Sequence, residues 1–115
     1  MAFADPEHEL SPAQLDELLK SGEADLVDVR EPYEWEAGRI DGARHIELER
    51  LASQAETIDR DRPIVFQCRV GARSAMAAQA FRAAGYDAWS MAGGLVRWTD
   101  EGLPLEPSDG HVADH

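Results

Sequence analysis

The sequence lacks the features that mark disulfide-stapled, secreted and membrane-spanning proteins. Its single cysteine cannot form a disulfide within the chain. No stretch approaches the roughly 20 apolar residues of a membrane-spanning helix, and the N-terminal segment MAFADPEHEL lacks the basic and apolar regions of a signal peptide. We therefore expect a cytoplasmic protein with no membrane partner, whose lone thiol needs an explanation.

Basic residues are scarce as well. The 115 residues include 11 Lys and Arg against 23 Asp and Glu, and the formal net charge of -12 argues against nucleic acid as a partner. The few positive charges are concentrated, however. Between Arg62 and Tyr86 there is no acidic residue, and Arg62, Arg69, Arg73 and Arg82 all lie there. This distribution predicts an anion-attracting patch on an acidic protein.

The length and the hydrophobic pattern fit one domain. With 43% hydrophobic and 30% charged residues, the chain has enough apolar surface to bury a core without metals or disulfides. Short apolar runs bounded by turn residues predict strands, and stretches with helical spacing between an N-cap and a glycine predict helices. The predicted strands are 7–10, 24–29, 64–66 and 88–91, and the predicted helices are 12–20, 31–37, 48–55, 75–84 and 95–100.

The alternation of strands and helices predicts a single α/β domain over residues 1–105. We expect a three-layer domain with a mainly parallel central sheet flanked by helices, because parallel strands need helical crossovers that cover both faces of the sheet. The polar residues 106–115 are expected to form a flexible C-terminal tail.

The one cysteine lies where a strand runs into a helix. In the segment IVFQCRVGARS, residues 64–74, Cys68 directly follows the apolar strand. Backbone N–H groups in such a turn have no helical acceptors, so they attract an anion and favour a thiolate without a histidine base. Gly71 can take the positive φ that curls the loop around the sulfur, and Arg69 and Arg73 can hold an oxyanion.

A structural role has to be weighed against this functional one. A lone cysteine at the end of a strand is often only a small buried hydrophobic residue. Arg69, Gly71 and Arg73 favour a functional site, because a buried core position needs no such neighbours. The carboxyl ends of parallel strands are also where α/β domains bind ligands, and Cys68 lies at one of them.

Four segments of the chain resemble the rhodanese family. Residues 68–73 match the Cys-x-x-Gly-x-Arg of its active loop, and residues 28–30, Asp-Val-Arg, match its Asp-x-Arg motif. Residues 38–43 are similar to its Gly-His-Ile-x-Gly-Ala segment, and residues 85–98 are similar to its C-terminal signature. The resemblance extends over nearly the whole chain.

This resemblance implies a sulfurtransferase that needs no metal or cofactor. The Cys68 thiolate would take the outer sulfur of a small anionic donor such as thiosulfate, and the persulfide would pass it to a thiol, cyanide or a partner protein. Asp28 and Arg30 would be structural support for the neighbouring loop. The loop that binds persulfide and donor would consist of Arg69, Val70, Gly71, Ala72 and Arg73.

Two alternatives stay open on the sequence alone. A cysteine-dependent phosphatase or arsenate reductase also uses a thiolate in an anion-binding loop that ends in arginine, but that loop is longer than the four residues between Cys68 and Arg73. The other alternative is a non-catalytic or persulfide-carrying rhodanese module that acts on a protein partner, because fold alone does not establish activity. The intact Cys68, Gly71 and Arg73 favour the enzyme.

Overall fold

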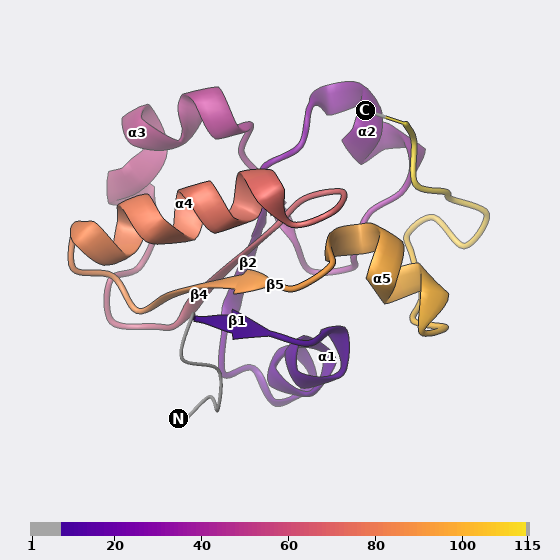
Figure 1. Cartoon of the computed structure of the whole chain (residues 1–115), viewed down its shortest axis with the longest axis horizontal. Coiled ribbons are helices and arrows are strands. Elements are labelled where there is room, and N and C mark those ends of the chain that lie inside the picture. The colour runs from indigo at the N-terminus through magenta and orange to yellow at the C-terminus, as the bar shows by residue number, and fades with distance from the viewer. Residues whose placement is uncertain (1–7, 115) are drawn as a thin grey trace.

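The computed structural model describes residues 8–114, which form a parallel β-sheet with helices on both faces (Figure 1). The strands of this described part are β1 (Glu9–Leu10), β2 (Asp25–Asp28), β3 (Arg44–His45), β4 (Ile64–Gln67) and β5 (Ala88–Met91). They are hydrogen-bonded in the order β1-β5-β4-β2-β3, and every pairing between them is parallel. The predicted α/β fold is therefore confirmed. Glu7, included in the predicted first strand, lies outside the described residues.

Helices connect the strands. They are α1 (Pro12–Ser21), α2 (Pro32–Ala37), α3 (Leu51–Gln54), α4 (Ala72–Ala83) and α5 (Gly94–Asp100), with 3-10 turns η1 (Leu48–Arg50) and η2 (Ala55–Thr57) flanking α3. The sequence predicts one helix over 48–55, whereas the structure has this composite of α-helix and 3-10 turns. Strand β3 is too short and polar to leave a hydrophobic pattern. Over residues 8–114, none of the helices is long and apolar enough to cross a membrane.

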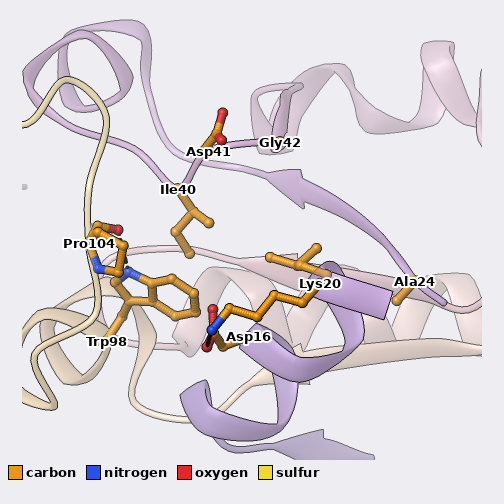
Figure 2. A pocket seen from close by; sticks show the side chains of 9 residues that line it. Asp16, Lys20, Ala24, Ile40, Asp41, Gly42, Trp98 and Pro104 are labelled. Atoms are coloured by element: carbon orange, nitrogen blue, oxygen red, sulfur yellow. Dashed lines mark hydrogen bonds and ion pairs between the residues drawn. The ribbon is translucent and has the colours of Figure 1, made fainter. Parts of the chain in front are cut away.

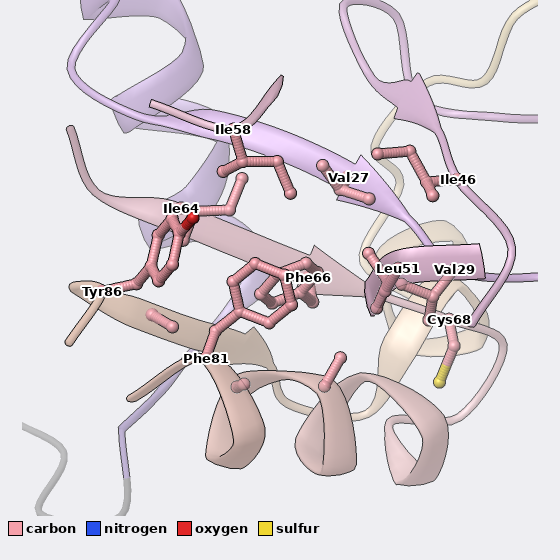
Figure 3. Close-up of a cluster of buried hydrophobic side chains, with 13 residues drawn as sticks. Val27, Val29, Ile46, Leu51, Ile58, Ile64, Phe66, Cys68, Phe81 and Tyr86 are labelled. Atoms are coloured by element: carbon pink, nitrogen blue, oxygen red, sulfur yellow. The ribbon is translucent and has the colours of Figure 1, made fainter. Parts of the chain in front are cut away.

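Each face of the sheet buries its own hydrophobic cluster. On the face covered by α3 and α4, Phe66 and Phe81 belong to a cluster that also contains Cys68 (Figure 3). On the opposite face, Val65 belongs to a cluster with Trp98 of α5. Neighbouring residues of β4 therefore point to opposite faces, as the two-residue period of a strand requires. Cys68 directly follows the carboxyl end of β4, at the edge of the first cluster.

A buried ion pair closes the carboxyl end of β2. Arg30 Nη2 donates to Asp28 Oδ2 at 2.7 Å and to the Gly38 carbonyl at 2.8 Å, and both side chains of the pair are fully buried. The backbone N–H of Arg30 donates to Asp28 Oδ1 at 3.0 Å, so the carboxylate turns the chain immediately before α2. Charges this deep persist only when they are paired. The pair therefore fixes the direction in which α2 leaves the sheet.

The last described residues run beside α2 (Figure 1). Arg39 and Glu106 exchange backbone hydrogen bonds of 2.9 and 2.7 Å, and the His111 N–H donates to the Ala37 carbonyl at 2.9 Å. Val112 packs against the cluster that contains Trp98. The sequence predicts a flexible tail over 106–115. The structure gives this segment a defined path as far as residue 114, and its mobility stays a prediction.

Candidate active site

Cys68 is buried in the turn that leads from β4 into α4. The residue is 0% exposed, and Figure 3 shows its sulfur beside the start of α4. The backbone N–H of Gly71 donates to Sγ at 3.1 Å. Gly71 has a φ of +106°, in the left-handed region that the sequence predicts for it, and this lets residues 68–73, the cysteine loop, curl around the sulfur. The sulfur therefore lies in a cradle suited to an anion.

Two serine hydroxyls lie behind the sulfur. Ser74 Oγ is 3.6 Å from Cys68 Sγ, donates to the Gly71 carbonyl at 3.2 Å and forms a 2.7 Å hydrogen bond with Ser90 Oγ. Both serines are fully or almost fully buried. A hydroxyl both donates and accepts, so Ser74 can accept from a thiol and donate to a sulfur anion. In the sequence Ser74 is readable only as a helix opener, and Ser90 only as a strand residue.

The start of α5 holds the cysteine loop from the other side. The Leu95 N–H donates to the Cys68 carbonyl at 2.8 Å, and the Val96 N–H donates to the Arg69 carbonyl at 3.0 Å. Gly94, with φ +61°, makes this approach possible, because a Cβ at this position would overlap the backbone of Arg69. The glycine pair at 93–94 therefore allows α5 to hold the loop that carries the sulfur.

Arg73 ends the cysteine loop, and its guanidinium binds a carboxylate of α2. Its Nη1 donates to Glu34 Oε1 at 2.8 Å, and its Nη2 donates to Glu34 Oε2 at 3.0 Å. The Glu34 side chain is 0% exposed. The sequence predicts that Arg73 holds the oxyanion of a donor, but in the structure both terminal nitrogens of Arg73 donate to Glu34. Arg73 therefore joins the cysteine loop to α2.

The sequence does not reveal Glu34. The pattern of α2 predicts that Trp35 faces the core, yet Trp35 is only half-buried and stacks on His45 with 5.0 Å between ring centroids. The fully buried residue of the helix is its neighbour Glu34. A glutamate in a charged segment carries no hydrophobic signal, and its burial becomes understandable only when Arg73 is placed opposite it.

The Glu34 carboxylate stays charged in spite of its burial. Burial raises the pKa of Glu34, but hydrogen bonds from Arg73 and from the Glu31 backbone N–H, together with the charges of Arg73 and Arg30, outweigh it and leave the pKa below its usual 4.5. The hydrogen bond with Glu34 in turn raises the pKa of Arg73. The ion pair is therefore intact at neutral pH.

Arg69 is the other cation of the loop, and its pairing is weak. Its Nη2 lies 3.5 Å from Asp114 Oδ1, and the Asp114 side chain is 99% exposed. Its Nε is buried and has no hydrogen-bond partner within residues 8–114. Exposed ion pairs of this kind contribute little, so an incoming anion can displace Asp114. Val70, at the tip of the loop, is 53% exposed.

A cavity of about 270 Å³ adjoins the cysteine loop. Its lining consists of Val29, Glu31, Glu47, Leu48, Glu49 and Arg73. A larger cavity of about 420 Å³ lies on the other face of the sheet, where Asp16 of α1, Ile40 and Trp98 are among its lining residues (Figure 2). Cys68 lines neither cavity, but Arg73 of the cysteine loop lines the smaller one and no residue of that loop lines the larger one, so the smaller cavity is the one that adjoins the loop.

These features define a class of protein, a three-layer α/β domain with one cysteine in the loop between a parallel strand and a helix, where a backbone N–H donates to its sulfur. The profile of the rhodanese-like domain family matches residues 11–101, and the chain belongs to this family of sulfurtransferases. The thiosulfate sulfurtransferase GlpE of Pseudomonas aeruginosa is 33% identical over 111 residues, which cover 96% of this chain and 99% of that protein.

Solved structures agree with this assignment. The human single-domain sulfurtransferase TSTD1 superposes with a TM-score of 0.75 and 33% identity, over 82% of this chain and 96% of that one. Other relatives are longer. The chain spans 60% or less of several of them, and 25% of the probable adenylyltransferase/sulfurtransferase MoeZ of Mycobacterium tuberculosis, which is 38% identical over 99 residues.

The lowered pKa of Glu34 predicts how stability depends on pH. A carboxylate whose pKa is lower in the folded state adds stability above its unfolded pKa of about 4.5, and that stability is lost as the pH falls through the folded value. We expect Glu34→Gln to be less stable than the wild type at pH 7, with a smaller further loss on acidification below pH 4.5. Urea unfolding at a series of pH values measures both.

Glu36→Gln is the matched control, because Glu36 lies on the same helix but is exposed. It should follow the wild-type curve. If Glu34→Gln and Glu36→Gln gave the same acid dependence, the ion pair with Arg73 would not be the source of that stability.

Proposed function

We propose that this chain transfers sulfane sulfur from a donor such as thiosulfate to a thiophilic acceptor through a persulfide on Cys68. The observation that carries the proposal is the 3.1 Å hydrogen bond from the Gly71 N–H to Cys68 Sγ, in a loop held by both α4 and α5. Family membership supports it, as do relatives named as sulfurtransferases. The reaction needs a reduced thiol, so a reducing compartment such as the cytoplasm suits it.

The first half of the reaction loads the cysteine. The Cys68 thiolate attacks the outer sulfur of thiosulfate, the sulfur–sulfur bond of the donor breaks, and sulfite leaves with the electron pair. The product is a persulfide whose terminal sulfur lies about 2 Å beyond Sγ and carries the negative charge. In this proposal the backbone N–H groups of residues 69–73 hold this charge, as an oxyanion hole holds oxygen.

The second half of the reaction unloads it. A nucleophilic acceptor, either cyanide or a thiolate on a small molecule or protein, attacks the terminal sulfur. The bond to Sγ breaks, and Cys68 leaves as a thiolate, with the Gly71 N–H 3.1 Å away to donate to it. No net oxidation or reduction of the protein occurs over the cycle, and no cofactor is required by this chemistry.

The two arginines take different parts in this proposal. Arg69, whose partner Asp114 is exposed, captures the oxyanion end of the donor. Arg73 is a positioning residue, because its bidentate pair with Glu34 fixes the end of the cysteine loop. Asp28 and Arg30 form the buried ion pair at the end of β2, and this pair supports α2, the helix that carries Glu34.

The cysteine itself gives the first prediction. Cys68→Ala should abolish thiocyanate formation from thiosulfate and cyanide, because no other residue of the chain can carry a persulfide. Thiocyanate is measured colorimetrically, with a generic phosphate ester assayed alongside. Residual thiocyanate formation in Cys68→Ala would contradict the mechanism, and cysteine-dependent ester hydrolysis would favour the phosphatase alternative.

The arginine assignment gives the second prediction. Arg69→Gln should raise KM for thiosulfate by roughly tenfold and leave kcat nearly unchanged, since one charge-assisted hydrogen bond to the donor is worth about 1.5 kcal/mol. Steady-state kinetics measure the split. Arg62→Gln is the control, because it removes the same charge just before β4, at the other end of the strand. An equal rise of KM in both variants would show a general charge effect and refute a binding role for Arg69.

A further inference from the structure

The cavity beside the cysteine loop is acidic, although the loop is in the segment of the chain that lacks acidic residues. We call it the glutamate cavity and define it by Val29, Glu31, Glu47, Leu48, Glu49 and Arg73. Three carboxylates line it, and they come from segments distant in sequence from the loop. Arg73 supplies the one positive charge in the lining, and Glu34 neutralises it within 3.0 Å. The lining residues therefore carry a net negative formal charge.

The glutamate cavity belongs to the site. Arg73 lines the cavity and ends the cysteine loop, and Val29 is in the same hydrophobic cluster as Cys68, close to it in Figure 3. The Leu48 N–H donates to the Val29 carbonyl at 3.0 Å, and this hydrogen bond fixes the Leu48 side of the cavity against the end of β2. Arg69 does not line the cavity. The cation proposed to capture the donor is thus separate from the carboxylates that line the cavity.

From this separation, and on the basis of the proposed function, we propose that the glutamate cavity selects a sulfur acceptor whose thiol stands beside a positive charge. Glu31, Glu47 and Glu49 attract such an acceptor and repel an anionic thiol, because a cleft lined by one sign of charge concentrates the opposite sign. Val29 and Leu48 provide an apolar floor for the carbon chain that joins the amine to the thiol.

The size of the cavity restricts the acceptor further. A volume of about 270 Å³ lies below the range of pockets that enclose drug-sized ligands, so it holds a small aminothiol or one cysteine of a basic peptide segment. In the transfer, the acceptor thiol loses its proton to solvent and its thiolate attacks the terminal sulfur of the Cys68 persulfide. The bond to Sγ breaks, and the acceptor leaves as a persulfide while Cys68 regains its thiolate.

The test is a single-turnover experiment. The protein is loaded with thiosulfate, freed of excess donor and mixed with cysteamine, 2-mercaptoethanol or 3-mercaptopropionate, which are cationic, neutral and anionic. The loss of protein persulfide is followed by intact mass, and rates are compared per thiolate. We expect cysteamine to exceed 3-mercaptopropionate by about tenfold at low salt. The advantage should disappear near 1 M salt, where the screening length is about 3 Å.

Variants assign the preference to the cavity. Glu47→Gln combined with Glu49→Gln should reduce the advantage of cysteamine several-fold, whereas Glu36→Gln, an exposed glutamate outside the lining, should leave it unchanged. Glu31 is retained because it forms the capping box of α2. A second experiment uses peptides in which a cysteine is flanked by lysine or by glutamate. Faster transfer to the lysine peptide than to cysteamine would identify a protein segment as the source of the thiol.

Failure of this inference differs visibly from failure of the proposed function. Normal persulfide loading with equal transfer to the three thiols, or with faster transfer to the anionic one, would overturn the acceptor preference alone. An equal effect of the Glu36→Gln control would do the same, since the preference would then reflect the net charge of the protein. Absence of persulfide loading would overturn both.

Discussion

The ion pair between Glu34 and Arg73 is the interaction on which the arrangement of the site depends. It joins α2 to the first turn of α4 above the carboxyl ends of β2 and β4, which pair in register. Glu34 is fully buried, so loss of its partner would leave a carboxylate without water or counter-charge, and a buried pair broken in this way costs about 3 to 5 kcal/mol. The cysteine loop is therefore held by charge at one end and by the α5 backbone at the other.

The Cys68 sulfur is enclosed by the protein, but polar groups are among its nearest neighbours. Cys68 is fully buried, yet its immediate neighbours are a backbone N–H at 3.1 Å and a hydroxyl at 3.6 Å instead of hydrocarbon alone. The different roles proposed for the two arginines follow from their partners. Arg73 is held by the buried Glu34, whereas Arg69 is paired with the exposed Asp114, which an anion can replace.

Local signals in the sequence predict most of the fold. Ser11, Pro12 and Gln14 specify the start of α1 through a capping box, and Gly71 takes the positive φ expected from its place in the loop. Local signals of this kind do not predict the buried polar contacts. Glu34 is next to Trp35, the more hydrophobic residue, and Ser90 meets Ser74 only because β5 lies beside β4. These contacts depend on which strands pair, and residue spacing does not encode that directly.

The most direct test of the central claim is the intact mass of the protein after incubation with thiosulfate and removal of the donor. The account predicts a mass increase of one sulfur atom, located on Cys68 by peptide mapping and removed by cyanide with release of thiocyanate. A protein that gained no sulfur from thiosulfate or from a polysulfide donor, while its Cys68 thiol remained reduced, would contradict it.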